Sequence, residues 1–146
     1  MKPILIILLL ALLQSCLSQK EHVRRNFSYK DDMGVSRDIP VIVPKGYTRQ
    51  EIRLLDNGIL EQVYHYRNGS LMFFAYMPRG GDYLPIDTAY HIPQPQYQGG
   101  IFYKGTGIGE YWWREAQINA LRVGYTKVPS DYEWRFDSAV NYVRFR

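Results

Sequence analysis

The sequence has little of the chemistry on which several large protein classes depend. Among its 146 residues there is one cysteine, so this chain alone can form neither an intrachain disulfide framework nor a multi-cysteine zinc or iron–sulfur site. The formal charge of +4 is small and the basic side chains are scattered, which is weak support for nucleic-acid binding. A chain of this length forms one domain and has no room for two catalytic domains.

Signatures of catalysis are also missing from the sequence. There is no G-x-S-x-G elbow, no H-E-x-x-H helix and no G-x-x-x-x-G-K-[ST] phosphate loop. The three histidines have no histidine partner at i+2 or i+4, so we expect no metal site and no cofactor. The acidic side chains that could serve acid–base catalysis are dispersed: Asp82, Asp87, Glu110 and Glu115. We therefore expect no enzymatic activity unless the fold brings two carboxylates together.

The N-terminus, in contrast, has the features of an export signal. Lys2 precedes ten apolar residues, Ile4 to Leu13, a run of the length of a secretory signal core and too short to span a bilayer. The tetrad Leu13-Gln14-Ser15-Cys16 that follows resembles the lipobox of bacterial lipoproteins. The resemblance implies that residues 1–15 are a signal peptide and that Cys16 receives a diacylglyceryl thioether and an N-acyl group. Several acyl chains hold a protein on a membrane without a transmembrane helix.

A second cleavage site remains open. Cys16-Leu17-Ser18 also fits the small-x-small pattern of ordinary signal peptidase, which would cut before Gln19 and release a soluble, secreted protein without cysteine. If Cys16 is lipidated, Leu17 stands where an aspartate would retain the protein on the inner membrane under the enterobacterial sorting rule. The resemblance thus favours the outer membrane. Residues 16–38 mix charges and show no apolar period, so we expect a lipid-anchored tether there.

From Ile39 to the last residue the pattern is that of a single α+β domain. Short apolar runs alternate with turn dipeptides, which indicates an antiparallel sheet. At the C-terminus, Ser130 and Glu133 match the S-x-x-E capping box, and an apolar stripe follows at helical spacing. The fold class we predict for 39–146 is α+β, an antiparallel β-meander of five to seven strands packed against one C-terminal helix. The predicted strands are 39–44, 49–55, 59–67, 71–77, 101–103, 110–118 and 121–128.

Aromatic residues suggest a binding surface. Tyrosines recur every seven residues from Tyr76 to Tyr97, and the interspersed prolines exclude a heptad helix. Flat rings in extended chain can stack on sugars or peptide prolines, or they can complete a small core. The candidate ligand-binding residues are Tyr90, Tyr97, Trp112 and Trp113. Because neighbouring residues of a strand face opposite ways, we expect one of the two tryptophans to be buried and the other exposed.

The function we predict is that of a membrane-anchored cell-envelope lipoprotein, a non-enzymatic structural or interaction module. Its partners are the membrane, through lipid on Cys16, and an envelope protein, glycan or peptide, with no nucleic acid. The first alternative is a glycan-, peptide- or lipid-binding protein of the envelope; the second is the soluble secreted protein that begins at Gln19. A cavity of a few hundred cubic ångströms under the sheet would favour lipid carriage, and a filled core the interaction module.

Overall fold

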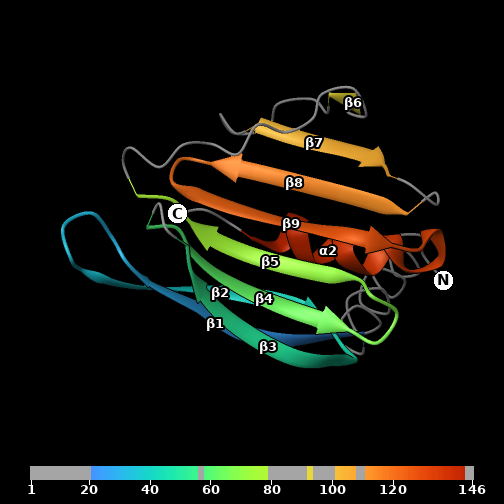
Figure 1. Ribbon diagram of the computed structural model, residues 1–146, viewed down its shortest axis with the longest axis horizontal. Coiled ribbons are helices and arrows are strands. Elements are labelled where there is room, and N and C mark those ends of the chain that lie inside the picture. Colours follow the sequence, from blue (N-terminus) through green and yellow to red (C-terminus); the bar gives the residue numbers. More distant parts are fainter. Residues whose placement is uncertain (1–20, 56–57, 79–91, 94–100, 108–110, 144–146) are drawn as a thin grey trace, which may run out of the picture.

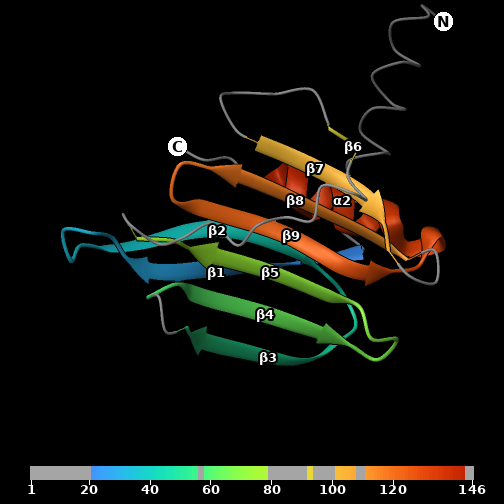
Figure 2. The same cartoon turned by 45° about the horizontal axis from the view of Figure 1, so that its top comes forward.

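The structure is a computed structural model that describes residues 21–55, 58–78, 92–93, 101–107 and 111–143. Cys16, Tyr90, Tyr97, Asp82, Asp87 and Glu110 lie outside these described residues. Figure 1 shows the arrangement of the strands and the helix, and Figure 2 shows the same view turned forward.

The described chain forms two antiparallel sheets. The strands are β1 (His22–Lys30), β2 (Ser36–Pro44), β3 (Tyr47–Leu54), β4 (Leu60–Tyr66), β5 (Leu71–Tyr76), β6 (Ile92–Pro93), β7 (Ile101–Thr106), β8 (Trp112–Ile118) and β9 (Leu121–Val128). β1 and β2 pair with each other as a hairpin, and the other seven form a sheet of order β3-β4-β5-β9-β8-β7-β6. A short 3-10 turn, η2 (Ser130–Tyr132), leads into the helix α2 (Glu133–Tyr142).

The hairpin and the helix cover the same face of the seven-stranded sheet, side by side (Figures 1 and 2). Phe27 of β1 lies 6.2 Å from Phe74 of β5, measured between ring centroids, and Phe136 of α2 lies 5.5 Å from Tyr125 of β9. Both contacts belong to one continuous apolar core. The molecule therefore has two layers, of which the second is half hairpin and half helix.

The expected fold class is confirmed: an antiparallel sheet packs against one C-terminal helix. The apolar stripe of the helix is buried as predicted, at Phe136, Ala139, Val140 and Val143. The strand order differs from a simple meander, since β5 pairs with β9 and not with the next strand along the chain. Two meanders, β3–β4–β5 and β7–β8–β9, thus join in the middle of the sheet.

The prediction of a tether over residues 16–38 is wrong from His22 onward. This segment supplies β1 and the start of β2, with Phe27 only 2% exposed. The charged residues between Val23 and Lys30 made the strand difficult to recognise in the sequence. A strand can carry them because only one face of the hairpin meets the core and the other faces solvent. Folded structure therefore begins much closer to Cys16 than the sequence indicates.

The predicted capping box is also wrong. Ser130 lies in the 3-10 turn and the α-helix begins at Glu133, with no side-chain hydrogen bond at its N-cap. The Glu133 carboxylate is instead ion-paired with Lys104 of β7. An ion pair between the helix and the sheet is therefore found where the sequence predicted a capping hydrogen bond within the helix.

Candidate functional site

An open groove of about 690 Å³ lies where the tip of the hairpin meets the C-terminal end of α2. The hairpin, the first residue of β9 and the last turn of the helix all contribute to it. Its lining residues are Tyr29, Arg37, Asp38, Ile39, Pro40, Leu121, Asn141 and Tyr142. The groove is the candidate functional site because polar and apolar groups from three separate segments converge there.

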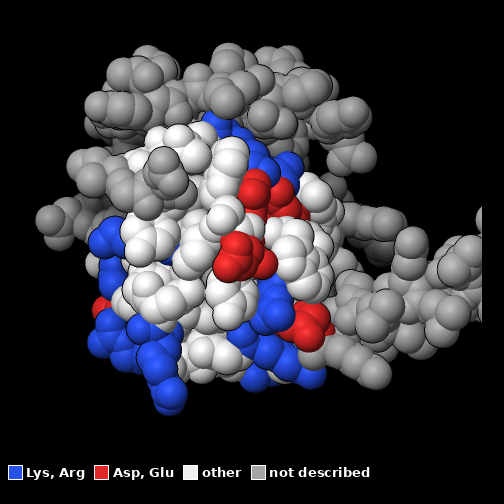
Figure 3. Space-filling view, turned by 90° about the vertical axis from the view of Figure 1, so that its right-hand side faces the viewer, with Lys and Arg blue, Asp and Glu red and all other residues white. Residues whose placement is uncertain are grey.

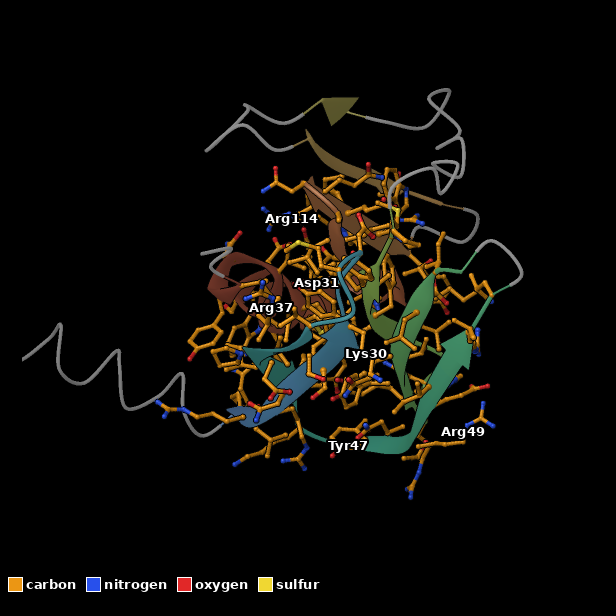
Figure 4. All side chains as sticks on the ribbon, turned by 90° about the vertical axis from the view of Figure 1, so that its left-hand side faces the viewer. Lys30, Asp31, Arg37, Tyr47, Arg49 and Arg114 are labelled. Carbon is orange, nitrogen blue, oxygen red and sulfur yellow. The ribbon has the colours of Figure 1, made fainter. Side chains whose placement is uncertain are left out.

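The turn of the hairpin fixes the polar rim of this groove. Asp31 Oδ1 accepts hydrogen bonds from the backbone N–H groups of Met33 (3.0 Å) and Val35 (2.9 Å), which closes the turn around Gly34 at φ +77°. Asp31 Oδ2 accepts a hydrogen bond of 2.9 Å from Arg37 Nε, and Figure 4 shows these two side chains next to each other. The backbone hydrogen bond from Val35, together with Arg37, holds the pKa of Asp31 below its usual range. Arg37 is thus held at the rim by a carboxylate that stays ionised.

Two tyrosines connect the tip of the β1–β2 hairpin to the large sheet. The rings of Tyr29 and Tyr76 are stacked with centroids 4.4 Å apart, and Tyr76 donates a 2.6 Å hydrogen bond to Asp32 Oδ1. Burial, with this bond to Asp32, raises the pKa of Tyr76 to about 12, so the phenol keeps its proton at neutral pH. The stacking occupies one face of the Tyr29 ring. Tyr142, 39% exposed, offers the more accessible aromatic surface in the groove.

A small void lies in the core next to the groove. Among the described residues, the void next to Phe27, Phe74, Val123 and Val143 measures about 10 Å³. A space of this size holds at most about one water molecule.

A charged cluster on the opposite face of the sheet does not have the geometry of a catalytic acid–base pair. Glu115 of β8 is 5% exposed. Its carboxylate accepts hydrogen bonds from Nε and Nη2 of Arg122, and Nη2 lies 2.5 Å from Oε2. Gln117 Nε2 donates to Glu115 Oε1 at 2.5 Å. The carboxylate is therefore satisfied by an ion pair and an amide. Within the described ranges, no group of three or more His, Cys, Asp or Glu side chains could hold a metal ion.

A second polar cluster lies under α2. Asp137 accepts hydrogen bonds from Lys104 (2.7 Å), Arg114 (3.0 Å) and Tyr125 (2.8 Å), which belong to β7, β8 and β9. Burial alone would raise the pKa of Asp137, but Lys104, Tyr125 and Arg114 together lower it. Asp137 thus stays ionised against the sheet. The cluster holds the helix on the sheet.

The two candidate tryptophans are neighbours in β8. Trp112 and Trp113 are both half-buried, so the expected contrast of one buried and one exposed ring is wrong. The pairing of β8 with β9 shifts register between Trp112 and Arg114, and such a bulge breaks the regular alternation on which the expectation depended. Trp112 packs against the core, and Lys104 Nζ lies 5.0 Å from its ring centroid.

Sequence reasoning missed the groove itself. Its rim residues Arg37 and Asp38 fell in the supposed tether, and Asn141 and Tyr142 were read only as the end of a helix. One signal could have revealed the hairpin: Phe27 and Tyr29 alternate with polar residues before the Asp31-Asp32-Met33-Gly34 turn, and the apolar run from Ile39 to Val43 follows it.

No family model, curated protein or solved structure matches this chain. Among the described residues, no helix is long and apolar enough to cross a membrane.

Proposed function

We propose that the protein is a lipid-anchored interaction module of the cell envelope, and that the groove between the hairpin tip and α2 receives a segment of a partner protein. The anchor is Cys16, within the lipobox-like tetrad Leu13-Gln14-Ser15-Cys16. The observation that supports the interaction role most strongly is the open groove of about 690 Å³, next to which the core void at Phe27, Phe74, Val123 and Val143 measures only about 10 Å³. Binding at the surface is favoured over carriage of a lipid in the interior.

The chemistry of the groove favours a polypeptide partner. Ile39, Pro40 and Leu121 give an apolar floor, while Arg37 and Asn141 can bond to the backbone or side chains of an extended chain. A sugar would need free ring faces for stacking, and one face of Tyr29 is already taken by Tyr76. A glycan remains the alternative ligand.

Site-specific photocrosslinking in cells tests the groove. A photoreactive amino acid in place of Tyr142 should give one discrete protein adduct. The matched control is the same amino acid in place of Tyr132, which is 43% exposed at the other end of the helical segment and should not give that adduct. Arg37→Ala, at an exposed position, should remove the adduct while leaving the protein folded. Equal adducts from both tyrosines, or an adduct that survives Arg37→Ala, would contradict a groove partner, and binding only to a glycan array would favour the alternative.

Fatty-acid labelling tests the anchor. Wild type should incorporate labelled palmitate, and Cys16→Ser should release the protein from membranes or leave an uncleaved precursor. A mature N-terminus at Gln19 without label would show that the protein is the soluble, secreted form.

A further inference from the structure

We propose that the end of the molecule where β1 begins docks directly on a membrane surface that carries anionic head groups. The inference rests on the proposed anchor at Cys16, and it goes beyond it by naming the protein surface that meets the lipid. Three independent observations converge on this end of the molecule.

The first observation is charge. The register of the strands brings to this end the beginning of β1, the β2–β3 turn, the β4–β5 turn and the end of β9. Each of these segments carries exposed basic side chains, which are Arg24, Arg25, Lys45, Arg67 and Lys127. Figure 3 faces this end and shows basic side chains along its lower part. Of the described carboxylates nearby, Glu21 is paired with Arg135 at 3.0 Å and Glu133 with Lys104, and Asp131 lies in the exposed turn η2.

The second observation is a pair of exposed aromatic side chains at the same end. Trp134 is 51% exposed and Tyr132 43% exposed, in the first turn of α2 and in η2. The Arg135 guanidinium lies 5.0 Å from the centroid of Tyr132 and 5.4 Å from that of Trp134. Tryptophan and tyrosine are enriched at membrane–water interfaces, where an apolar ring and a polar tip are both satisfied. Basic residues beside such rings match the charge and polarity of an anionic head-group layer.

The third observation is the length of chain between the anchor and the folded body. His22 is the first residue of β1, its Nε2 lies 2.7 Å from the carbonyl oxygen of Arg135, and the Lys45 N–H donates to the Glu21 carbonyl. Only residues 17–21 separate this fixed point from Cys16, so a fully extended chain reaches about 20 Å. A lipidated Cys16 would therefore keep the basic end within reach of the head groups.

The opposite end carries side chains of both charges. There the hairpin tip carries Asp31, Asp32 and Asp38 beside Lys30 and Arg37, and the groove opens at this end. Strands of nine residues, at about 3.3 Å per residue, separate the two ends by roughly 27 Å. Docking through the basic end thus directs the groove away from the membrane.

Quenching in vesicles tests the proposal with the mature chain purified from cells. A fluorophore is attached to Ser130→Cys at the basic end or to Val35→Cys at the hairpin tip, and the protein is reconstituted into vesicles with head-group-labelled quencher lipid. The new thiol is the only free one, because Cys16 is either thioether-linked or removed. The Ser130→Cys probe should be quenched more in vesicles containing phosphatidylglycerol than in phosphatidylcholine alone, and the Val35→Cys probe should not. Molar salt, which shortens the Debye length to about 3 Å, should abolish the difference.

Matched charge reversals identify the surface. Lys45→Glu should weaken docking on anionic vesicles roughly thirtyfold, since each basic residue near such a surface contributes about a factor of five. Arg67→Glu is the second variant at this end, and Lys30→Glu, an exposed lysine at the far end of the same hairpin, should leave docking unchanged. Equal quenching in neutral and anionic vesicles, or equal effects of Lys45→Glu and Lys30→Glu, would overturn the proposal.

Failure of the anchor is distinguishable from failure of docking. If the mature chain begins at Gln19, the anchor proposal is wrong. The same labelled chain, added to preformed vesicles and sedimented, still reports whether the basic end binds anionic lipid. Sedimentation with anionic vesicles only, and its loss in Lys45→Glu, would support docking without an anchor; no sedimentation with either vesicle would overturn docking as well.

Discussion

The same face of the large sheet is covered in two different ways. Where the hairpin covers the sheet, the contact is largely apolar and is made by side chains such as Phe27 and Val41 against Phe74. Where α2 covers the sheet, an apolar stripe is joined by Asp137, which accepts hydrogen bonds from side chains of three different strands. One half of the second layer is thus attached by burial with hydrogen bonds such as that from Tyr76 to Asp32, and the other by burial together with the buried Asp137 carboxylate and its three donors.

The two contacts differ in what they determine. Both hold an element on the sheet, but the polar cluster also fixes where that element lies. Apolar contacts are non-directional, so they hold the hairpin to the sheet without specifying each atom pair. Asp137 meets Lys104, Arg114 and Tyr125 together in one placement of the helix, so we infer that this cluster sets the position of α2 along the sheet. The two attachments should therefore respond differently to side-chain truncation and to pH.

Truncation of the hairpin anchor should have the largest effect. Phe27→Ala removes a side chain that is 2% exposed and leaves a cavity, so the free energy of unfolding should fall by about 3–5 kcal/mol. Because no ionised group is removed, urea melts near neutral and acid pH should show a similar loss. A loss of only a few tenths of a kcal/mol would mean that the hairpin is not docked on the sheet.

Neutralising the helix cluster should have a smaller but pH-dependent effect. Asp137→Asn leaves three donors without their carboxylate, and for this side chain, 23% exposed, we expect a loss of about 2–3 kcal/mol at neutral pH. Because folding lowers the pKa of Asp137, its stabilising contribution is present above the unfolded pKa of about 3.9 and is lost as pH falls through the folded pKa.

Below the folded pKa of Asp137, the free energies of unfolding of wild type and Asp137→Asn should converge. Urea melts over a pH series measure this convergence. Asp131→Asn, in the exposed turn before the helix, is the matched control and should change stability at no pH. Parallel pH curves for wild type and Asp137→Asn would show that the carboxylate does not hold the helix.

A truncation in the apolar stripe of α2 tests the part of the helix contact that resembles the hairpin contact. Val140 is 3% exposed, so Val140→Ala should lower the free energy of unfolding by about 1–2 kcal/mol without pH dependence. Asn141→Ala, at the exposed neighbouring position, serves as the control in the same melts. If both variants are as stable as wild type, α2 does not pack as described.

The smallest expected effect is at Ser130. Since Ser130 makes no capping hydrogen bond, Ser130→Ala should change the free energy of unfolding by less than about 0.5 kcal/mol. A loss near 1 kcal/mol in thermal or urea melts would restore the capping box that the sequence suggested.

Local periodicity made most of the large sheet predictable. The strand around Val123 and the stripe of α2 were found because one face of each is buried, which leaves a period of two or of about 3.6 in the sequence, and the strand around Phe74 was found as a continuous apolar run. The 39–44 part of β2 was predicted, but β1 was missed because exposed charges such as Arg24 and Arg25 interrupt its apolar residues. The groove could not be predicted, since Tyr29, Leu121 and Tyr142 are brought together only by tertiary packing.

The junction of the two meanders has a consequence for the order of folding. β3, β4 and β5 join through short turns, as do β7, β8 and β9, so each group forms from contacts that are close in sequence. The pairs that unite them, from Leu71 with Thr126 to Tyr76 with Leu121, close far longer stretches of chain. Loop closure of that length is entropically costly and raises contact order, so we expect the β5–β9 ladder to form late and to limit the folding rate. Until β9 has emerged from the ribosome, β5 remains an open edge.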